Sequence, residues 1–193
     1  KTATPTFAFC LFILISVFVG VATLPLYQFT ALAIKLEDRG PVFIHQNRVG
    51  PGNKIIRIVK FRSMRTNDGG KWLTKNDRRI THVGKFIRKT RIDELPQLWS
   101  VLKGDISLIG PRPDIIDLGE ELKASIPYYS LRNIIKSGLS GWAQIHQELP
   151  PQSLAETTLR LGYDFFYLKN RSFMLDLEIA LKTIKTLLSR AGI

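Results

Sequence analysis

The feature that most constrains this chain is an uncharged stretch of 33 residues, from Thr2 to Ile34. A helix needs roughly 20 apolar residues to cross the hydrocarbon core of a bilayer, so the stretch is long enough to be a membrane segment. Pro25 removes the backbone donor that would bond to the carbonyl of Val21, which predicts a kink or a break there. Two geometries remain open: a kinked span, or a re-entrant helix pair that enters and leaves on the same face.

A cleavable signal peptide is the competing interpretation, because Lys1 precedes the apolar residues. The stretch is longer than the usual ~7–15 residue apolar region of a signal peptide, and no small-x-small cleavage site stands out before Lys35. The basic residues that follow favour a cytoplasmic location for the rest of the chain. We therefore expect a membrane-inserted segment over residues 1–36, followed by a single unit over residues 37–193.

The charge of the chain is strongly positive. Of 193 residues, 28 are Lys or Arg and 16 are Asp or Glu, which gives a formal net charge of +12. Such a balance predicts attraction to polyanions such as nucleic acid, anionic lipid or nucleotide phosphates, without choosing among them. Fourteen of the basic residues lie between Arg48 and Arg91, where the only acids are Asp68 and Asp77.

Two short runs rich in β-branched and aromatic residues, Val42–Gln46 and Ile55–Phe61, flank the turn signal Gly50-Pro51-Gly52-Asn53, which predicts a β-hairpin. Lys60 and Arg62 are two residues apart at the end of the second run, and strand alternation would place them on one face. That spacing suits a grip on neighbouring phosphate oxygens. Two solvated charges at a strand edge would show the same spacing.

Asp93 and Glu94 are adjacent carboxylates just downstream of the basic region. Thr90 suits the N-cap of a helix whose first turn would hold both acids, and Pro96 is tolerated near a helix start. Acids in a first turn interact favourably with the helix dipole and should stay ionised. Asp93 is then a candidate nucleophile toward phosphorus, with Glu94 helping to hold Mg²⁺ and Arg88 neutralising phosphoryl oxygens. The competing interpretation is that Asp93 and Glu94 are ordinary acids of a helix first turn, with no role in catalysis.

Arg112 lies between Pro111 and Pro113, which fix φ on both sides of it. A guanidinium on so stiff a loop suits a phosphate or nucleotide clamp, while a rigid turn with an exposed arginine is the plain alternative. The glycine-punctuated stretch Gly138–Gln144 would let a ligand approach the backbone closely, and Gln144 is a candidate substrate contact.

The C-terminal residues predict an amphipathic helix that starts after Ser172 and carries a basic polar side. Its apolar side could lie on an anionic membrane or pack into the core, and both readings stay open. Asn67–Gly70 predicts a loop. His45, His82 and His146 are too far apart in sequence for a metal-binding histidine motif.

With these motifs assembled, the chain resembles the bacterial sugar transferases of the monotopic polyprenyl-phosphate phosphoglycosyl transferase family, which initiate glycoconjugate or exopolysaccharide assembly. The resemblance runs from the apolar segment to the C-terminus, and its motifs occur together and in order. They are Lys60-Phe61-Arg62-Ser63-Met64, Gly84-Lys85-Phe86-Ile87-Arg88, Asp93-Glu94-Leu95-Pro96-Gln97-Leu98, Lys103-Gly104-Asp105-Ile106-Ser107, Gly110-Pro111-Arg112-Pro113, Tyr163-Asp164, Asn170-Arg171-Ser172 and Asp176.

The resemblance implies an α+β, mainly helical fold with a re-entrant, proline-broken membrane helix, a small β-hairpin and amphipathic helices at the membrane surface. It implies a location at the cytoplasmic face of the bacterial inner membrane, with residues 37–193 as the catalytic unit. The implied reaction moves sugar-1-phosphate from a UDP-sugar donor to a polyprenyl phosphate such as undecaprenyl phosphate, and it releases UMP.

The resemblance also implies roles for individual residues. The aspartate of the family's Asp-Glu pair is the nucleophile, so this role passes to Asp93, through a covalent phosphosugar intermediate. Asp93 and Glu94 are the expected ligands of Mg²⁺. The expected substrate contacts are Arg88, Lys60, Arg62, Arg112, Pro111, Pro113 and Gln144.

The chain departs from the family pattern at several positions. Lys136-Ser137-Gly138 stands where Arg-Pro-Gly is usual, and His146 stands where an asparagine is expected. Both changes bear on contacts to the donor sugar more than on the core reaction. The basic pair and aspartate that usually precede the membrane helix are absent, as is the multi-span region that many relatives carry, which would fit an excised catalytic portion.

Two other classes of function compete with this one. A membrane-tethered, non-catalytic partner in polysaccharide assembly would use the basic region only to hold anionic lipid or nucleotide. Nucleic-acid binding is suggested by the charge alone, and we expect none because no recognised nucleic-acid module is visible. The motifs do not specify the sugar, and self-association into a homo-oligomer is left open.

Overall fold

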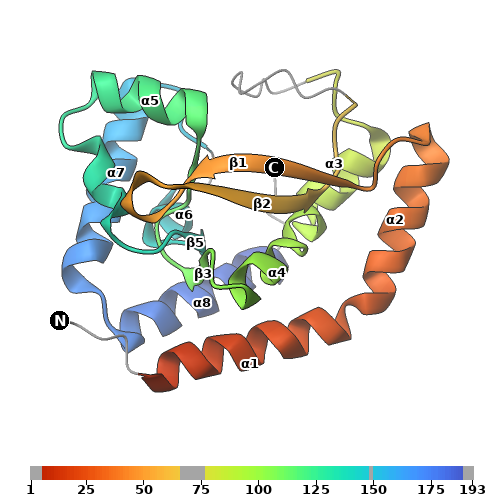
Figure 1. Ribbon diagram of the computed structural model, residues 1–193, viewed down its shortest axis with the longest axis horizontal. Helices are drawn as coiled ribbons and strands as arrows, with labels where there is room; N and C mark the ends of the chain where they lie inside the picture. The colour runs from red at the N-terminus through yellow and green to blue at the C-terminus, as the bar shows by residue number, and fades with distance from the viewer. Residues whose placement is uncertain (1–5, 66–76, 148–149, 189–193) are drawn as a thin grey trace.

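The computed structural model describes residues 6–65, 77–147 and 150–188, so the loop predicted at Asn67–Gly70 lies outside the described residues. The described chain is mainly helical with a small amount of sheet, which confirms the expected α+β class (Figure 1). The elements in order are α1 (Thr6–Ala22), α2 (Leu24–Asp38), β1 (Phe43–Val49), η1 (Pro51–Asn53), β2 (Ile55–Phe61), α3 (His82–Lys89), η2 (Ile92–Glu94), α4 (Gln97–Leu102), β3 (Ser107–Ile109), β4 (Asp114–Ile115), α5 (Ile116–Ser125), η3 (Tyr129–Ile134), β5 (Gly138–Ser140), α6 (Trp142–His146), α7 (Leu154–Asn170) and α8 (Phe173–Leu188), where η marks a 3-10 helix.

The uncharged stretch forms two helices separated by Thr23, whose hydroxyl donates a hydrogen bond to the carbonyl of Val19 (2.7 Å). Pro25 lies at the start of α2, where its missing N–H removes no bond that the helix needs. The break expected near Pro25 is therefore confirmed. No single helix in the described part is long and apolar enough to cross a membrane, whereas Ser16–Ala22 and Leu24–Asp38 together, across a bend of 56°, pass that test of length and composition.

The last turn of α2 is joined to two other elements by acidic side chains. Glu37 accepts hydrogen bonds from the backbone N–H groups of His82 (2.6 Å) and Val83 (3.1 Å), at the start of α3. Asp38 forms an ion pair with Arg62, just after β2. An apolar core cluster beneath these contacts consists of Ile34, Phe61 and Ile87. These contacts fix the end of α2 against β2 and α3.

The predicted hairpin is confirmed: β1 and β2 pair antiparallel, and the short β4 pairs with the other edge of β1. The register sets Ile44 opposite Lys60 and Arg48 opposite Ile56. Because opposed residues point to the same face and alternate residues share a face, Lys60 and Arg48 project from the same side of the hairpin. Arg57, on the other side, is exposed.

The prediction that Thr90 begins a helix containing both acids is wrong. Thr90 ends α3, and its hydroxyl donates to the carbonyl of Phe86 (2.9 Å). Pro96 would clash with the carbonyl of Ile92 in a continuous α-helix, so the chain makes a separate three-residue turn, η2, before α4 begins. Arg91 enters that turn in the left-handed conformation, with φ of 58°.

The C-terminal helix α8 packs one side into the core and leaves other apolar residues exposed. Ile179 is fully buried, and the Tyr167 hydroxyl of α7 donates to the Asp176 carboxylate (2.6 Å). Leu177 and Leu181, both expected on the apolar side, are exposed. Packing into the core is thus confirmed for one side of α8, and membrane contact of the exposed side stays a prediction. Figure 1 places α1 along one edge of the molecule, where it packs against α4.

Candidate active site

Asp93 is a buried carboxylate with an unused hydrogen-bonding atom. The residue is 7% exposed, and its Oδ1 has no hydrogen-bond partner among the residues that the structure describes. Burial raises the pKa of this carboxyl above its ordinary value, and the neighbouring charge of Glu94 raises it further. Asp93 lies in the 3-10 turn η2 and not in the first turn of an α-helix, so the expected stabilisation of its charge by a helix dipole does not apply. A buried polar atom without a partner commonly marks a place where a ligand binds.

Glu94 is the anion around which the cations of the site gather. Its Oε1 lies 3.1 Å from Lys60 Nζ, and its Oε2 accepts from Arg112 Nη1 at 3.2 Å, with a second contact from Arg112 Nη2 to Oε1. Burial alone would raise the pKa of Glu94, but Arg112 and Lys60 hold it well below its usual range. Both oxygens are thus occupied by cations in this structure, and the metal-binding role of Glu94 stays a prediction.

Lys60 extends from β2 into this cluster, and its predicted contact with substrate phosphate stays a prediction. Burial lowers the pKa of its ammonium to about 8, against the opposing attraction of Glu94. The nearby charge of Arg112 lowers it further. Lys60 therefore holds a charge that depends on pH near neutrality, unlike an arginine in the same place.

Arg112 reaches Glu94 from the loop between β3 and β4, and its predicted role as a phosphate or nucleotide clamp stays a prediction. Its Nη1 also lies 3.4 Å from the carbonyl oxygen of Leu139, and Gln144 Nε2 donates to the same oxygen at 3.4 Å. Gln144 is thereby brought next to the arginine, and its buried Oε1 has no partner among the described residues. The carbonyl of Pro111 accepts from the backbone N–H of Gly138 (2.9 Å), so this proline holds the loop in place.

The predicted role of the glycine-punctuated stretch needs correction. Strands β3 and β5 run parallel, and a Cβ atom at Gly138 would lie 2.1 Å from the backbone nitrogen of Gly110. A Cβ atom at Gly141 would lie 2.4 Å from the carbonyl oxygen of Gly110. The backbone that comes close to these glycines is the chain's own, and the contact positions the loop that carries Arg112.

Arg88 and Arg62, the other two predicted phosphate contacts, do not pair with Glu94 among the described residues. Arg88, in the last turn of α3, opposes the rise of the Asp93 pKa, and its Nη1 lies 4.0 Å from Met64 Sδ. It forms no ion pair within the described residues. Arg62 follows the end of β2, pairs with Asp38 and is not brought into the cluster around Glu94. The strand alternation that predicted a shared face with Lys60 ends at Phe61.

A second buried network, missed by the sequence reasoning, supports the Arg112 loop. Arg132 is 2% exposed; its Nε donates to Asp164 Oδ2 (2.8 Å) and its Nη2 to the backbone carbonyl of Arg112 (2.9 Å). Arg132 also pairs with Asp114, which accepts a hydrogen bond from the Tyr129 hydroxyl (2.9 Å). The sequence signal for Asp164 was its place in the Tyr163-Asp164 motif. Arg132 carried no comparable local signal.

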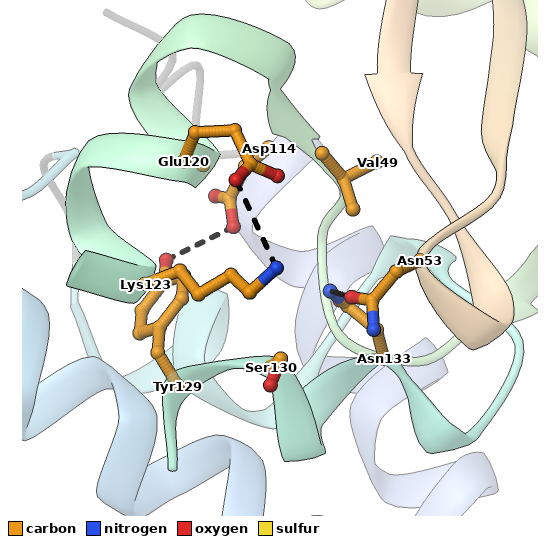
Figure 2. Close-up of a pocket in the computed structure, with 9 residues that line it drawn as sticks. Val49, Asn53, Asp114, Glu120, Lys123, Tyr129, Ser130 and Asn133 are labelled. Atoms are coloured by element: carbon orange, nitrogen blue, oxygen red, sulfur yellow. Dashed lines mark hydrogen bonds and ion pairs between the residues drawn. The ribbon is translucent and has the colours of Figure 1, made fainter. Parts of the chain in front are cut away.

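A small cavity lies beside this network (Figure 2). It is lined in part by Asp114 and Tyr129, and Figure 2 shows Asn133 reaching Asn53 in the hairpin turn, with 2.8 Å between Asn133 Nδ2 and Asn53 Oδ1. Its volume is about 10 Å³, near the minimum of roughly 10–15 Å³ that one water needs. The cavity is therefore too small for a nucleotide or a sugar.

The donor set decides how Mg²⁺ would fit this site. The described residues contain no group of three or more His, Cys, Asp or Glu side chains placed to hold a metal. Mg²⁺ in phosphate-transfer sites is commonly held by one or two carboxylates together with substrate phosphates. The free Oδ1 of Asp93 suits a metal that arrives with a diphosphate, and the site does not resemble an all-protein cage.

Comparison with known proteins gives consistent matches. The family model described as bacterial sugar transferase matches residues 6–190. A protein of Aeromonas hydrophila named UDP-N-acetylgalactosamine-undecaprenyl-phosphate N-acetylgalactosaminephosphotransferase is 48% identical over 87% of this chain and 40% of its own length. A protein of Escherichia coli K12 named UDP-glucose:undecaprenyl-phosphate glucose-1-phosphate transferase is 39% identical over 80% of this chain and 34% of its own length. The chain thus spans well under half of each of these two relatives.

A relative of similar size also matches. The exopolysaccharide production protein PSS of Rhizobium leguminosarum bv. phaseoli is 38% identical over 86% of this chain and 87% of its own length. The matched region in all three relatives is therefore most of this chain, including the residues around Asp93 and Arg112.

Proposed function

The chain belongs to the bacterial sugar transferase family, and from that premise we propose that it transfers a sugar-1-phosphate from a UDP-sugar to a polyprenyl phosphate such as undecaprenyl phosphate, with release of UMP. The names of the Aeromonas and Escherichia relatives state both a UDP-sugar and undecaprenyl phosphate. One observation carries the proposal for this chain: among the described residues, a buried carboxylate oxygen of Asp93 has no hydrogen-bond partner, and it lies beside a cluster of cations.

The first displacement uses Asp93 as the nucleophile. A carboxylate oxygen attacks the phosphorus that bears the sugar, the bond from that phosphorus to the bridging oxygen breaks, and the electron pair leaves on the phosphate of UMP. A mixed anhydride between the Asp93 carboxyl and the sugar phosphate remains. Lys60, Arg88 and Arg112 are the cations placed to stabilise the added negative charge.

The second displacement returns Asp93 to its starting state. An oxygen of the polyprenyl phosphate attacks the same phosphorus, the anhydride bond breaks, and its electron pair returns to the carboxylate. The product is a polyprenyl diphosphate sugar. Two displacements at one centre let a soluble donor and a lipid acceptor use the same buried site in turn.

Mg²⁺ is proposed as the cofactor, held by Asp93 and the donor diphosphate. When bound, it would neutralise charge on the diphosphate and so assist departure of the nucleotide. Glu94 keeps Lys60 and Arg112 converged, which fits a positioning role in addition to the expected metal role.

The bent pair α1–α2 is proposed to insert into the cytoplasmic face of the bacterial inner membrane as a re-entrant segment. Its length and composition, the bend of 56° and the exposed apolar side chains of both helices support this placement, and the lipid acceptor would then reach the site from the bilayer. The exposed apolar side of α8 is proposed to contact the same surface.

The test is direct detection of the intermediate. Purified protein incubated with Mg²⁺ and UDP-N-acetylgalactosamine or UDP-glucose should gain the mass of one phosphosugar and release UMP, and Asp93→Asn should abolish both. Asp117→Asn, at an exposed position in α5, is the matched control and should retain them. Lack of adduct and of UMP release across a broad panel of UDP-sugars would instead support a non-catalytic role in polysaccharide assembly.

A further inference from the structure

Arg48 is a half-buried arginine that the motifs did not single out. Its Nη1 donates to the carbonyl oxygen of Pro113 (3.2 Å), and its Nη2 donates to Gln46 Oε1 (2.8 Å). Its Nε is buried and has no hydrogen-bond partner among the described residues. The guanidinium thus touches the loop that carries Arg112, on the same hairpin face as Lys60.

Arg48 also has no counter-ion in the described part of the chain. Lys60 and Arg112 share Glu94, while Arg132 has Asp114 and Asp164. The partners of Arg48 are a neutral amide and a backbone carbonyl. Burial and the charge of Arg112 lower the pKa of Arg48 to about 10, against the attraction of Asp114 and Glu94, neither of which forms an ion pair with it among the described residues. What the described residues leave unsatisfied is the buried Nε–H of Arg48, and an anion bound beside it would supply the missing acceptor.

The arrangement of the cations indicates which anion. Lys60, Arg88 and Arg112 all act on Asp93, whose carboxylate would attack the transferred phosphorus. Arg48 and Arg112 act on one another, and both act on Lys60. Arg48 contacts Pro113 and therefore lies on the side of Arg112 that leads into β4. A diphosphate bound with one phosphorus at Asp93 would direct its other phosphate toward this pair.

We infer that Arg48, together with Arg112, binds the phosphate that leaves with the nucleotide. The inference rests on the proposed function and assigns a position to the leaving half of the donor. As the bond between the two phosphates breaks, negative charge grows on the departing phosphate, and guanidinium N–H groups at that phosphate stabilise the growing charge. The Nε–H of Arg48, which has no acceptor among the described residues, supplies a donor for that phosphate.

The experiment measures UMP binding by calorimetry, with the purified chain in lipid nanodiscs and no donor sugar present. Arg48→Gln should weaken UMP binding on the order of 10- to 100-fold, the loss associated with hydrogen bonds to a charged group. Arg48→Lys keeps the charge but not the planar set of donors, so its affinity for UMP should lie between those of the wild type and Arg48→Gln. Arg57→Gln removes an exposed arginine from the opposite face of the hairpin and should leave UMP binding unchanged.

Thermal unfolding of each variant without nucleotide separates ligand binding from a structural role. Equal UMP affinity in wild type and Arg48→Gln would overturn the inference, as would a fall in melting temperature with unchanged affinity. If Arg48→Gln does not fold, equal affinity in wild type and Arg48→Lys would overturn it in the same way. Adduct formation by the wild type reports the proposed function separately, so a protein that forms the adduct but binds UMP without Arg48 refutes this inference alone.

Discussion

A carboxylate that is 7% exposed normally has its buried oxygens hydrogen-bonded, whereas Oδ1 of Asp93 has no partner in the part of the chain that the structure describes. In its neighbour Glu94, by contrast, the carboxylate is paired with two cations, Lys60 and Arg112. The two adjacent acids therefore differ sharply in chemistry: one is held ionised, and the other has a raised pKa and a free oxygen. This division matches a nucleophile beside a fixed anionic anchor.

Backbone strain lies directly upstream of this pair. Arg91 adopts a φ of 58°, a conformation that costs a non-glycine residue on the order of 1 kcal/mol. Its Nη1 lies 4.0 Å from Glu94 Oε1, which adds another positive charge near the same anchor. The sequence did not predict this conformation, because an arginine gives no local signal for a positive φ.

The pH dependence of the reaction should reflect Asp93 and Lys60. Activity requires ionised Asp93, so kcat/KM should fall as the pH drops through its raised pKa. Activity also requires charged Lys60, which is protonated below its pKa of about 8, so kcat/KM should fall again above that value. The expected profile is bell-shaped.

Lys60→Arg provides the check on the alkaline limb, because an arginine stays charged across the range measured. The fall above pH 8 should vanish in this variant and persist in Lys54→Arg, an exposed control. An alkaline limb that survives in Lys60→Arg would assign the titration to another group.

At the scale of elements, the site depends on two short parallel strands that approach one another closely. Gly138→Ala would place a methyl group 2.1 Å from the backbone nitrogen of Gly110, so β5 or the Arg112 loop must move. The expected cost is about 1–3 kcal/mol of unfolding free energy, measured by urea denaturation. A large fall in donor turnover should accompany it, since Arg112 moves with the loop.

Gly162→Ala is the matched control for that change. Gly162 lies within α7, and a Cβ atom there would meet nothing within 4 Å. Removing a glycine from a helix interior should stabilise the protein by roughly 0.5–1 kcal/mol. Similar effects of the two substitutions would contradict the close approach of β3 and β5.

The elements that the sequence predicted are those whose structure is determined by residues close together in the chain. The hairpin follows from β-branched runs around a turn, the break near Pro25 follows from a missing N–H, and α8 follows from its periodicity. The turn that holds Asp93 could not be predicted in the same way, because it results from competition between Thr90 as a helix end and Pro96 as a helix start.

Long-range pairing explains the rest of what the sequence left open. Arg132 and Asp164 are 32 residues apart, and neither position shows a periodic or capping signal that would join them. Lys60 and Arg112 were expected at the site from their motifs, but their convergence on Glu94 depends on the packing of β2, η2 and the β3–β4 loop. Arg62 does not join Lys60 at Glu94, because β2 ends at Phe61 and Arg62 pairs with Asp38; its contact with substrate stays a prediction.

At the scale of the whole molecule, the proposed re-entrant segment makes a prediction about topology. Single cysteines at positions 2 and 35, in a Cys10→Ser background, should both react with a membrane-impermeant thiol reagent from the same side of sealed vesicles. A re-entrant pair returns the chain to the face it entered, which is the physical reason.

A cysteine at exposed position 117 in α5 reports the side on which residues 37–193 lie. It should react with the reagent from the same side as positions 2 and 35. Labelling of positions 2 and 35 from opposite sides would establish a kinked span and refute the re-entrant placement.

The contacts of Glu37 and Asp38 connect the orientation of α2 to the positions of α3 and β2. Its far end is bonded to the start of α3 and to the residue after β2, and these two elements carry Arg88 and Lys60. In the proposed placement, any tilt of α2 in response to bilayer thickness would act on both cations together. In that placement, the stiffness and acyl-chain length of the surrounding lipid would affect the rate of the proposed transfer at Asp93.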